Sequence, residues 1–268
     1  MTQRDVITDL TGEAAAVDAL VADLDPADWA LVTPAPQWTI ADQIAHLNFI
    51  FRLARTAASD AELFVVMTDG AVEDFEGAVN EALREFDDDS PGELLTKWRK
   101  ERDAAIKALS VVPPDRMVPW LVRPLPPAVL ACAGLMECFA HGQDIADTLG
   151  IVREGTDRLW HLAWFATLTW QFGYQARGLT PPDVQFRYEL TAPSGNEVWT
   201  FGPELSDQRI TGPATDFCLL VTRRRHRDDL AVTATGAEAD RWLDIAQAYR
   251  GPAGEGRQPR LSRPDGGE

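Results

Sequence analysis

The segment 129–149 restricts the fold most, because it is apolar along most of its length and yet carries ionisable side chains. Its apolar residues recur at helical spacing and Gly150 ends the pattern, so we predict a helix. Glu137 and His141 are four residues apart and would lie on one face of it. A carboxylate and an imidazole on a buried face require partners. The two side chains form either a hydrogen-bonded pair or part of a metal site.

A second histidine, His46, lies in another apolar segment, which we expect to be a helix from about Thr39 to Ala58. Thr39 is placed to cap this helix. Apolar residues cover more than half of its circumference, as is typical of a helix buried in a bundle. Two neutral imidazoles and one carboxylate would leave a dication with net positive charge and room for an exogenous ligand. His46, Glu137 and His141 are therefore the candidate metal ligands.

The other histidines and the cysteines have simpler interpretations. His161 stands among tryptophans and favours a core position, whereas His226 stands in a run of arginines and favours solvent. Cys138 lies roughly 100° around the helix from Glu137, so a buried, inert thiol is expected there. Asp144 either orients a ligating imidazole or is an ordinary exposed helix acid. The zinc-protease pattern HExxH is absent from the sequence.

Composition excludes several classes of partner. The 268 residues carry a formal net charge of −17, which argues against nucleic acid and anionic membranes. No apolar run approaches the roughly 20 residues of a membrane span, and the N-terminus does not resemble a signal peptide. Three cysteines without CxxC spacing predict no disulfide framework. We therefore expect a cytoplasmic protein in a reducing compartment.

The period of the apolar pattern changes at Pro181-Pro182. Before it, helical spacing predicts a bundle, including single helices over 61–86 and 156–177. After it, alternation over 184–190 predicts a strand that pairs with 197–201. The expected fold class is α+β, mainly α, with a helical bundle over 1–180, a small α/β domain over 181–253 and a disordered tail over 254–268.

Two motifs add a resemblance to these inferences. Residues 38–47 (WTIADQIAHL) and 136–145 (MECFAHGQDI) resemble the signatures of the mycothiol-dependent maleylpyruvate isomerase family. The resemblance implies a DinB-like metal-binding helical bundle, followed by a domain similar to sterol carrier proteins, whose likeness rests on 210–214 and 239–243. It also implies Zn²⁺, or another divalent metal such as Ni²⁺, held by His46, Glu137 and His141. An actinobacterial metal-binding subgroup is the best match.

Residues near the expected substrate entrance depart from the family pattern. Leu121–Pro126 replaces a small Gly- and Ser-containing loop, and Phe51 and Arg52 stand where an acidic residue is common. We assign Trp120, Arg123 and Phe51 to substrate binding, with side-chain packing as the alternative for the first two.

The resemblance also gives Arg224, or its neighbour Arg223, a catalytic role in binding an anionic group, and we group Asp144 with it. A guanidinium matches a carboxylate in a bidentate fashion. The alternative is a solvated helix end.

The predicted function is a divalent-metal enzyme that activates mycothiol for attack on a small electrophile. S-transfer and thiol-assisted isomerisation both fit, in specialised metabolism, and maleylpyruvate itself is not expected as the substrate. The alternatives are a thiol-independent cyclase or isomerase in the same pocket and a non-catalytic small-molecule-binding protein.

Overall fold

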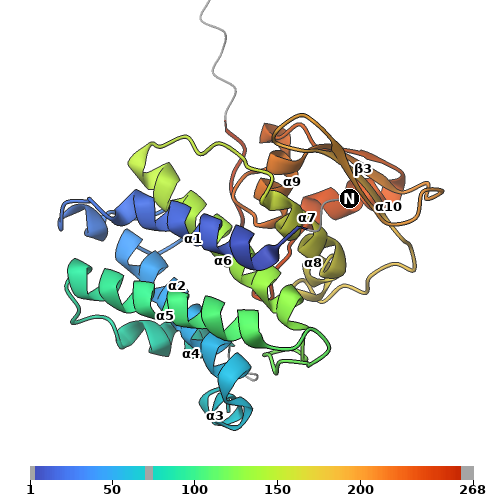
Figure 1. The fold of residues 1–268 in the computed structure, drawn as a ribbon. Helices are drawn as coiled ribbons and strands as arrows, with labels where there is room; N and C mark the ends of the chain where they lie inside the picture. The colour runs from blue at the N-terminus through green and yellow to red at the C-terminus, as the bar shows by residue number, and fades with distance from the viewer. Residues whose placement is uncertain (1–3, 70–74, 261–268) are drawn as a thin grey trace, which may run out of the picture. The chain divides into compact units, whose positions relative to one another are not determined.

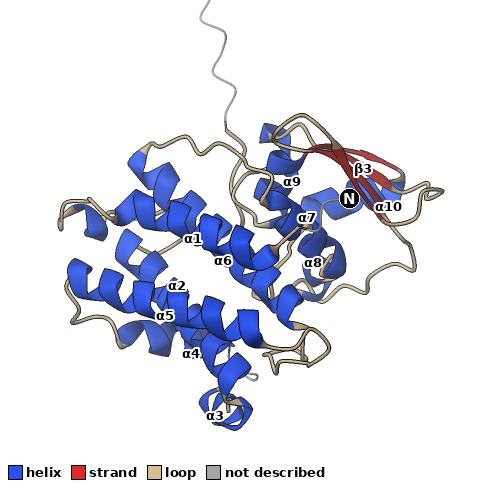
Figure 2. Ribbon diagram, in the orientation of Figure 1, coloured by secondary structure: helices blue, strands red, loops and turns tan. Residues whose placement is uncertain are grey.

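The computed structural model describes residues 4–69 and 75–260, which form two compact units, Met1–Arg153 and Glu154–Glu268. The predicted domain boundary at residue 180 therefore falls inside the second unit. The reason lies in α7 (Leu159–Leu168), whose apolar side chains pack against elements of the second unit, namely α9 (Ala214–Val221) and β2 (Val198–Phe201). Figures 1 and 2 show the elements of both units.

The first unit is a helical bundle. Its longest helices pack together, with α2 in contact with both α5 and α6, and α1 in contact with α6 (Figure 1). The elements of this unit are α1 (Val6–Val21), η1 (Asp28–Ala30), α2 (Ile40–Ser59), α3 (Ala61–Met67), α4 (Phe75–Arg84), α5 (Pro91–Val111) and α6 (Pro127–Leu149).

Local capping chemistry sets the ends of the helices that carry the bundle. The Thr39 hydroxyl accepts from the Asp42 backbone N–H, and the Asp42 carboxylate accepts from the Thr39 backbone N–H, which forms a capping box at α2. Ser90 and Glu93 form the same box at α5. Gly150 ends α6 in the left-handed conformation, with φ 68°. The signals at α2 and α6 explain why the predicted bounds of these two helices lie close to the observed ones.

The predicted single helix over 61–86 is wrong in the structure. The helix stops at Met67, and at this end the backbone N–H and the hydroxyl of Thr68 both donate to the Phe64 carbonyl. The next helix, α4, begins at Phe75. Gly70, a residue of low helix propensity inside the predicted helix, lies outside the described residues.

The second unit combines short helices with a four-stranded sheet. The strand order is β2-β1-β3-β4, with β1 antiparallel to β2, parallel to β3, and β3 antiparallel to β4. Besides α7, α9 and β2, the elements are α8 (Phe172–Gln175), β1 (Arg187–Thr191), β3 (Arg209–Pro213), η2 (Arg227–Asp229), β4 (Thr233–Thr235) and α10 (Ala237–Ile245). The predicted hairpin over 184–201 is therefore confirmed, with shorter strands.

Alternation along β1 places Tyr188 and Leu190 on the buried face of the sheet. Tyr188 contacts Phe217 of α9 and Trp242 of α10, so an aromatic cluster joins the sheet to two helices. The predicted helix over 156–177 is interrupted after Leu168, and α8 begins at Phe172. Residues 246–260 form no helix or strand, and the Arg260 backbone N–H donates to the Asp229 carboxylate at 2.9 Å.

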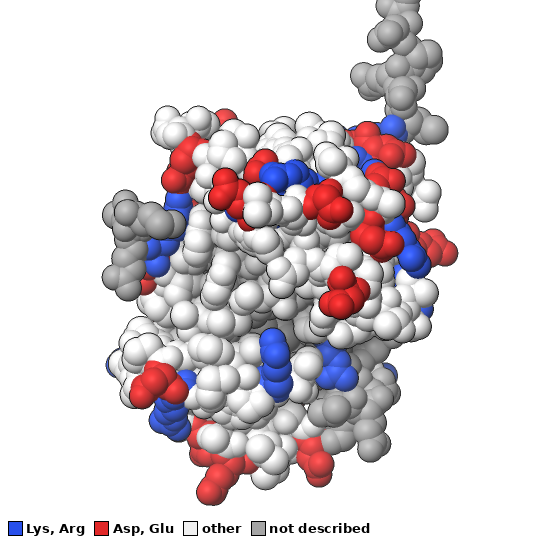
Figure 3. Space-filling view, turned by 90° about the vertical axis from the view of Figure 1, so that its right-hand side faces the viewer, with Lys and Arg blue, Asp and Glu red and all other residues white. Residues whose placement is uncertain are grey.

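The two architectures together confirm the predicted fold class, α+β and mainly α, with a helical bundle and a small α/β unit. Within the described residues, none of the helices combines the length and apolarity that crossing a membrane requires. On the face shown in Figure 3, acidic and basic side chains lie next to one another in groups, and wide uncharged areas lie between these groups.

Candidate metal centre

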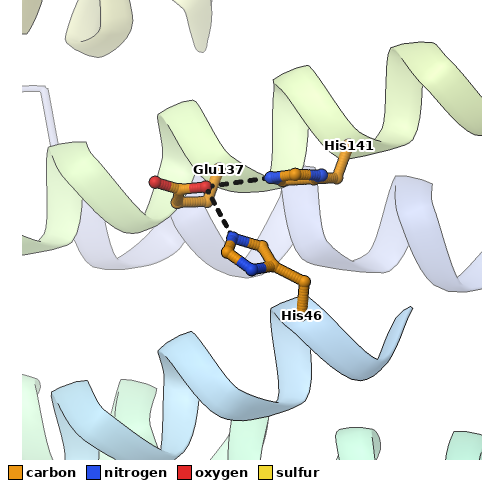
Figure 4. Close-up of side chains that lie close together, drawn as sticks. All are labelled: His46, Glu137 and His141. Carbon is orange, nitrogen blue, oxygen red and sulfur yellow. Dashed lines mark hydrogen bonds and ion pairs between the residues drawn. The ribbon is translucent and has the colours of Figure 1, made fainter. Parts of the chain in front are cut away.

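Helices α2 and α6 bring the three predicted ligands together. His46 lies in the second turn of α2, and Glu137 and His141 lie one turn apart on the face of α6 that meets it (Figure 4). One carboxylate oxygen, Glu137 Oε2, lies 3.1 Å from His141 Nε2 and 3.5 Å from His46 Nε2. The predicted juxtaposition of two imidazoles and one carboxylate is therefore present.

This cluster has the composition and size of a metal site. One ligand atom of each residue lies within 4.8 Å of the others, and both histidines are buried. Burial by itself raises the pKa of Glu137, but hydrogen bonds and charge from His141 and His46 outweigh it, so the carboxyl pKa lies below its usual range. An ionised carboxylate between two imidazoles is suited to a divalent cation.

Gln43 and Trp38 complete the surroundings of the cluster, and we did not single them out from the sequence. The Gln43 side chain contacts His141 Nδ1 through Oε1, at 2.5 Å. The Trp38 ring stacks on the His141 ring, with centroids 5.8 Å apart, and lies 5.1 Å from the His46 ring. The sequence does carry a sign of this role for Gln43, because Gln43 is a polar residue in an apolar helix. It stands three positions before His46 and therefore lies on the same face of the helix.

Asp144 is fully buried one turn beyond His141 on α6, so its interpretation as an exposed helix acid is wrong. The residue that contacts His141 Nδ1 is Gln43. A catalytic role for Asp144 stays a prediction.

The three predicted substrate-binding residues have different surroundings, and their role toward a substrate stays a prediction. Phe51 is buried, and the end of its ring lies 3.9 Å from the position that a Cβ on Gly134 would occupy, which places it in the packing between α2 and α6. Trp120 stacks on Phe64 of α3, with centroids 5.7 Å apart, and Arg123 is exposed in the same loop. Helix α3 follows the C-terminal end of α2, whereas His46 lies in the second turn of α2.

The cysteines and His161 are buried, as expected, whereas His226, which was expected in solvent, is half-buried. All three cysteines are free and buried, and burial raises the pKa of Cys132 to about 12 and that of Cys138 well above its usual value. His161 is buried in α7, as expected. His226 is half-buried, and its Nδ1 accepts from the Asp228 backbone N–H at 3.2 Å.

The arginine run follows α9 in the second unit. Arg224 donates to the Thr222 carbonyl at 2.6 Å, and Arg223 adopts a left-handed conformation with φ 60°. Neither side chain is fully exposed. A role for Arg224 toward an anionic group stays a prediction.

Comparisons with known proteins find a matching family in each of the two units. The family described as "Mycothiol maleylpyruvate isomerase N-terminal domain" matches residues 10–146, which include all three candidate ligands. A second family, described as "Wyosine base formation", matches residues 182–235 of the second unit.

Relatives and solved structures extend the match to most of the chain. The "Uncharacterized protein Rv0036c" of Mycobacterium tuberculosis strain H37Rv and "Uncharacterized protein MT0041" of strain CDC 1551 are each 45% identical over 251 residues, covering 94% of this chain and 97% of theirs. The crystal structure of the mycothiol-dependent maleylpyruvate isomerase shares the fold, with a TM-score of 0.56 at 15% identity, over 85% of this chain and 91% of that one. A structure of its histidine mutant matches equally well. This chain belongs to the mycothiol maleylpyruvate isomerase family.

Proposed function

We propose that this protein is a divalent-metal enzyme that uses mycothiol to attack a small electrophilic substrate. The cluster of His46, Glu137 and His141 carries the proposal, since its ligand atoms all lie within 4.8 Å of one another. Catalytic zinc sites commonly use three protein ligands and keep a further position for water or substrate. Membership of a family described by mycothiol and isomerase supports the thiol.

The donor set suits Zn²⁺, and Ni²⁺ as an alternative, because imidazole and carboxylate are ligands for both. A divalent ion held there would lower the pKa of a coordinated thiol, so that the thiolate forms at neutral pH. The chain's own residues have other tasks. The two helices hold the three side chains in place, and the Trp38 ring shields the imidazoles on one side.

The thiol would come from outside the chain. Cys132, Cys138 and Cys218 are all buried, and burial raises the pKa of the first two, so these side chains are poor nucleophiles at neutral pH. A soluble low-molecular-weight thiol would supply the sulfur instead. The solved structure with the same fold is a mycothiol-dependent enzyme by its description.

Two outcomes of the attack are consistent with this chemistry. When the thiolate adds to a double bond, a C–S bond forms and the adjacent carbon takes up the electron pair. Elimination after rotation breaks the C–S bond and returns the thiol, which is isomerisation. Protonation of that carbon keeps the C–S bond, which is S-transfer. We propose Arg224 as the group that binds an anionic part of the substrate, Asp144 as a supporting catalytic residue, and a cytoplasmic role in specialised metabolism.

Metal content is the first test. Protein purified with a chelator and reloaded should bind one Zn²⁺ or Ni²⁺ per chain, measured by elemental analysis and titration calorimetry. His46→Ala should abolish this binding, whereas His226→Ala, in the second unit, should bind like the wild type. At a hundredfold excess over Kd, metal should add about 2.7 kcal/mol of stability to the wild type. A wild-type protein without stoichiometric metal would refute the proposal.

Mycothiol is the second test. Mycothiol should raise the Tm of the metal-loaded protein, and its S-methyl derivative, which cannot form a thiolate, should raise it less. Consumption of the thiol with a panel of electrophiles would indicate S-transfer, whereas turnover without consumption would indicate isomerisation. Stoichiometric metal without any response to mycothiol would contradict the thiol assignment.

A further inference from the structure

A chain of hydrogen bonds runs from a backbone carbonyl to the metal cluster. Gln43, fully buried on α2, lies between Thr33 and His141. Its Nε2 donates to Thr33 Oγ1 at 2.9 Å, and its Oε1 lies 2.5 Å from His141 Nδ1. The Thr33 hydroxyl donates in turn to the Trp38 carbonyl at 2.8 Å. Every link in this chain is buried or partly buried, so water competes with it little.

The direction of each hydrogen bond follows from the first acceptor. The Trp38 carbonyl cannot donate, so the one hydroxyl hydrogen of Thr33 points at it. Thr33 Oγ1 is then an acceptor toward Gln43, and the group that Gln43 presents to it is the NH₂. The other end of the amide, the Gln43 carbonyl oxygen, therefore faces His141. The orientation of this amide is fixed by its network.

The amide orientation sets the tautomer of His141. A carbonyl oxygen only accepts, so His141 Nδ1 must carry the hydrogen. In the neutral ring, Nε2 then presents a lone pair toward Glu137 Oε2, 3.1 Å away. A lone pair and a carboxylate repel each other, unless a cation or a proton lies between them. The other imidazole is different, because among the described residues His46 Nδ1 is buried without a hydrogen-bond partner.

We propose that Gln43, held by Thr33, is a positioning residue that keeps His141 in the tautomer able to bind a metal through Nε2. The inference rests on the proposed metal site. Partners behind a ligating histidine raise metal affinity by about 10–100-fold. The amide of Gln43 would thus orient the ligand His141 and would not itself contact the cation.

Metal titration of matched variants tests the role of Gln43. Gln43→Met keeps the length of the side chain but removes the acceptor, and should weaken Zn²⁺ and Co²⁺ binding about 10–100-fold. Gln43→Glu restores an acceptor for Nδ1–H and should keep the affinity within a few-fold of the wild type. Thr33→Val frees the amide to rotate and should give an intermediate loss. Asn48→Leu, at another buried polar position of α2, should leave the affinity unchanged.

The tautomer itself is the readout that a merely structural role would not change. In ¹⁵N-labelled protein at pH 8, with and without Zn²⁺, His141 should show a protonated Nδ1, and Gln43→Met should lose this preference. A wild-type His141 protonated at Nε2 instead, or wild-type metal affinity in Gln43→Met, would overturn the inference. A wild-type protein that takes no metal would refute the proposed function instead, and the spectrum of the metal-free protein would still decide the tautomer.

Discussion

Removing the carboxylate of Glu13 should destabilise the first unit, because the Arg153 guanidinium would then be buried without its counter-charge. Glu13 lies on α1 and is 2% exposed, and its Oε1 lies 2.5 Å from Arg153 Nη2. Arg153 Nη1 donates to the Phe139 carbonyl at 2.9 Å. Phe139 lies between the two ligands of α6, so this ion pair connects α1 to the turn that carries the metal cluster.

The size of the effect follows from the burial of the two partners. Loss of one partner of a buried pair costs about 3–5 kcal/mol. The Arg153 side chain is 13% exposed and would keep its bond to the Phe139 carbonyl, so we expect the lower end, about 3 kcal/mol. Since each kcal/mol shifts the Tm of a domain this size by about 2–4 °C, Glu13→Ala should lower the Tm by about 6–12 °C.

Urea unfolding followed by circular dichroism would measure this loss. Glu13→Leu combined with Arg153→Met removes both charges and should recover most of the stability, because no buried charge is left unpaired. Glu81→Ala breaks an exposed pair with Arg84 and should cost less than about 1 kcal/mol. A loss below about 1 kcal/mol in Glu13→Ala, or a double variant as unstable as the sum of its single variants, would refute the reasoning.

Three further predictions concern packing, pH and thiol reactivity. Gly142→Ala should cost about 1–3 kcal/mol in urea unfolding, because its Cβ would lie 2.9 Å from Val17 Cγ2 on α1; an unchanged midpoint would show that the helices can separate there. A hydrogen bond from Arg99 holds the pKa of Asp18 below its usual range in the folded protein. The stability that this carboxylate adds is therefore fully present above its unfolded pKa of about 3.9. It is lost as the pH falls through the lower pKa of the folded state. Asp18→Asn should therefore be less stable than the wild type at pH 7, and the difference should shrink on acidification; a difference independent of pH would contradict this. Because the pKa of Cys132 is raised to about 12, native protein at pH 8 should resist alkylation there and react only when unfolded, and rapid labelling of the native protein would count against its burial.

Local signals predicted the helices that carry the site, because their ends are set by neighbouring residues. The capping box of Thr39 and Asp42 and the left-handed Gly150 act within a few positions of the chain. The prediction of one long helix over 61–86 was wrong, because it depended on periodicity without a signal for a helix end. Apolar periodicity continues across this range, and periodicity does not detect where inside it a helix ends, here at Met67.

The candidate ligands followed from helical spacing together with the two motifs, but their surroundings did not. Spacing places Glu137 and His141 on one face, because residues four apart lie over each other on any helix. The contact between Gln43 and His141 joins residues 98 positions apart, and it exists only because α2 and α6 pack together. Asp144, the nearer polar neighbour along the chain, was the natural choice from sequence alone.

The sequence by itself determined the class of the fold, the family and the identity of the three candidate ligands. These depend on residue type and short-range spacing, which the chain carries without reference to its folded partners. Only the tertiary structure decided that one carboxylate oxygen meets both imidazoles, that Thr33 and Gln43 orient one of them, and that Trp120 packs on Phe64. The physical reason is that hydrogen-bond direction and ring stacking depend on distances of a few ångströms between helices, and helix packing alone fixes those distances.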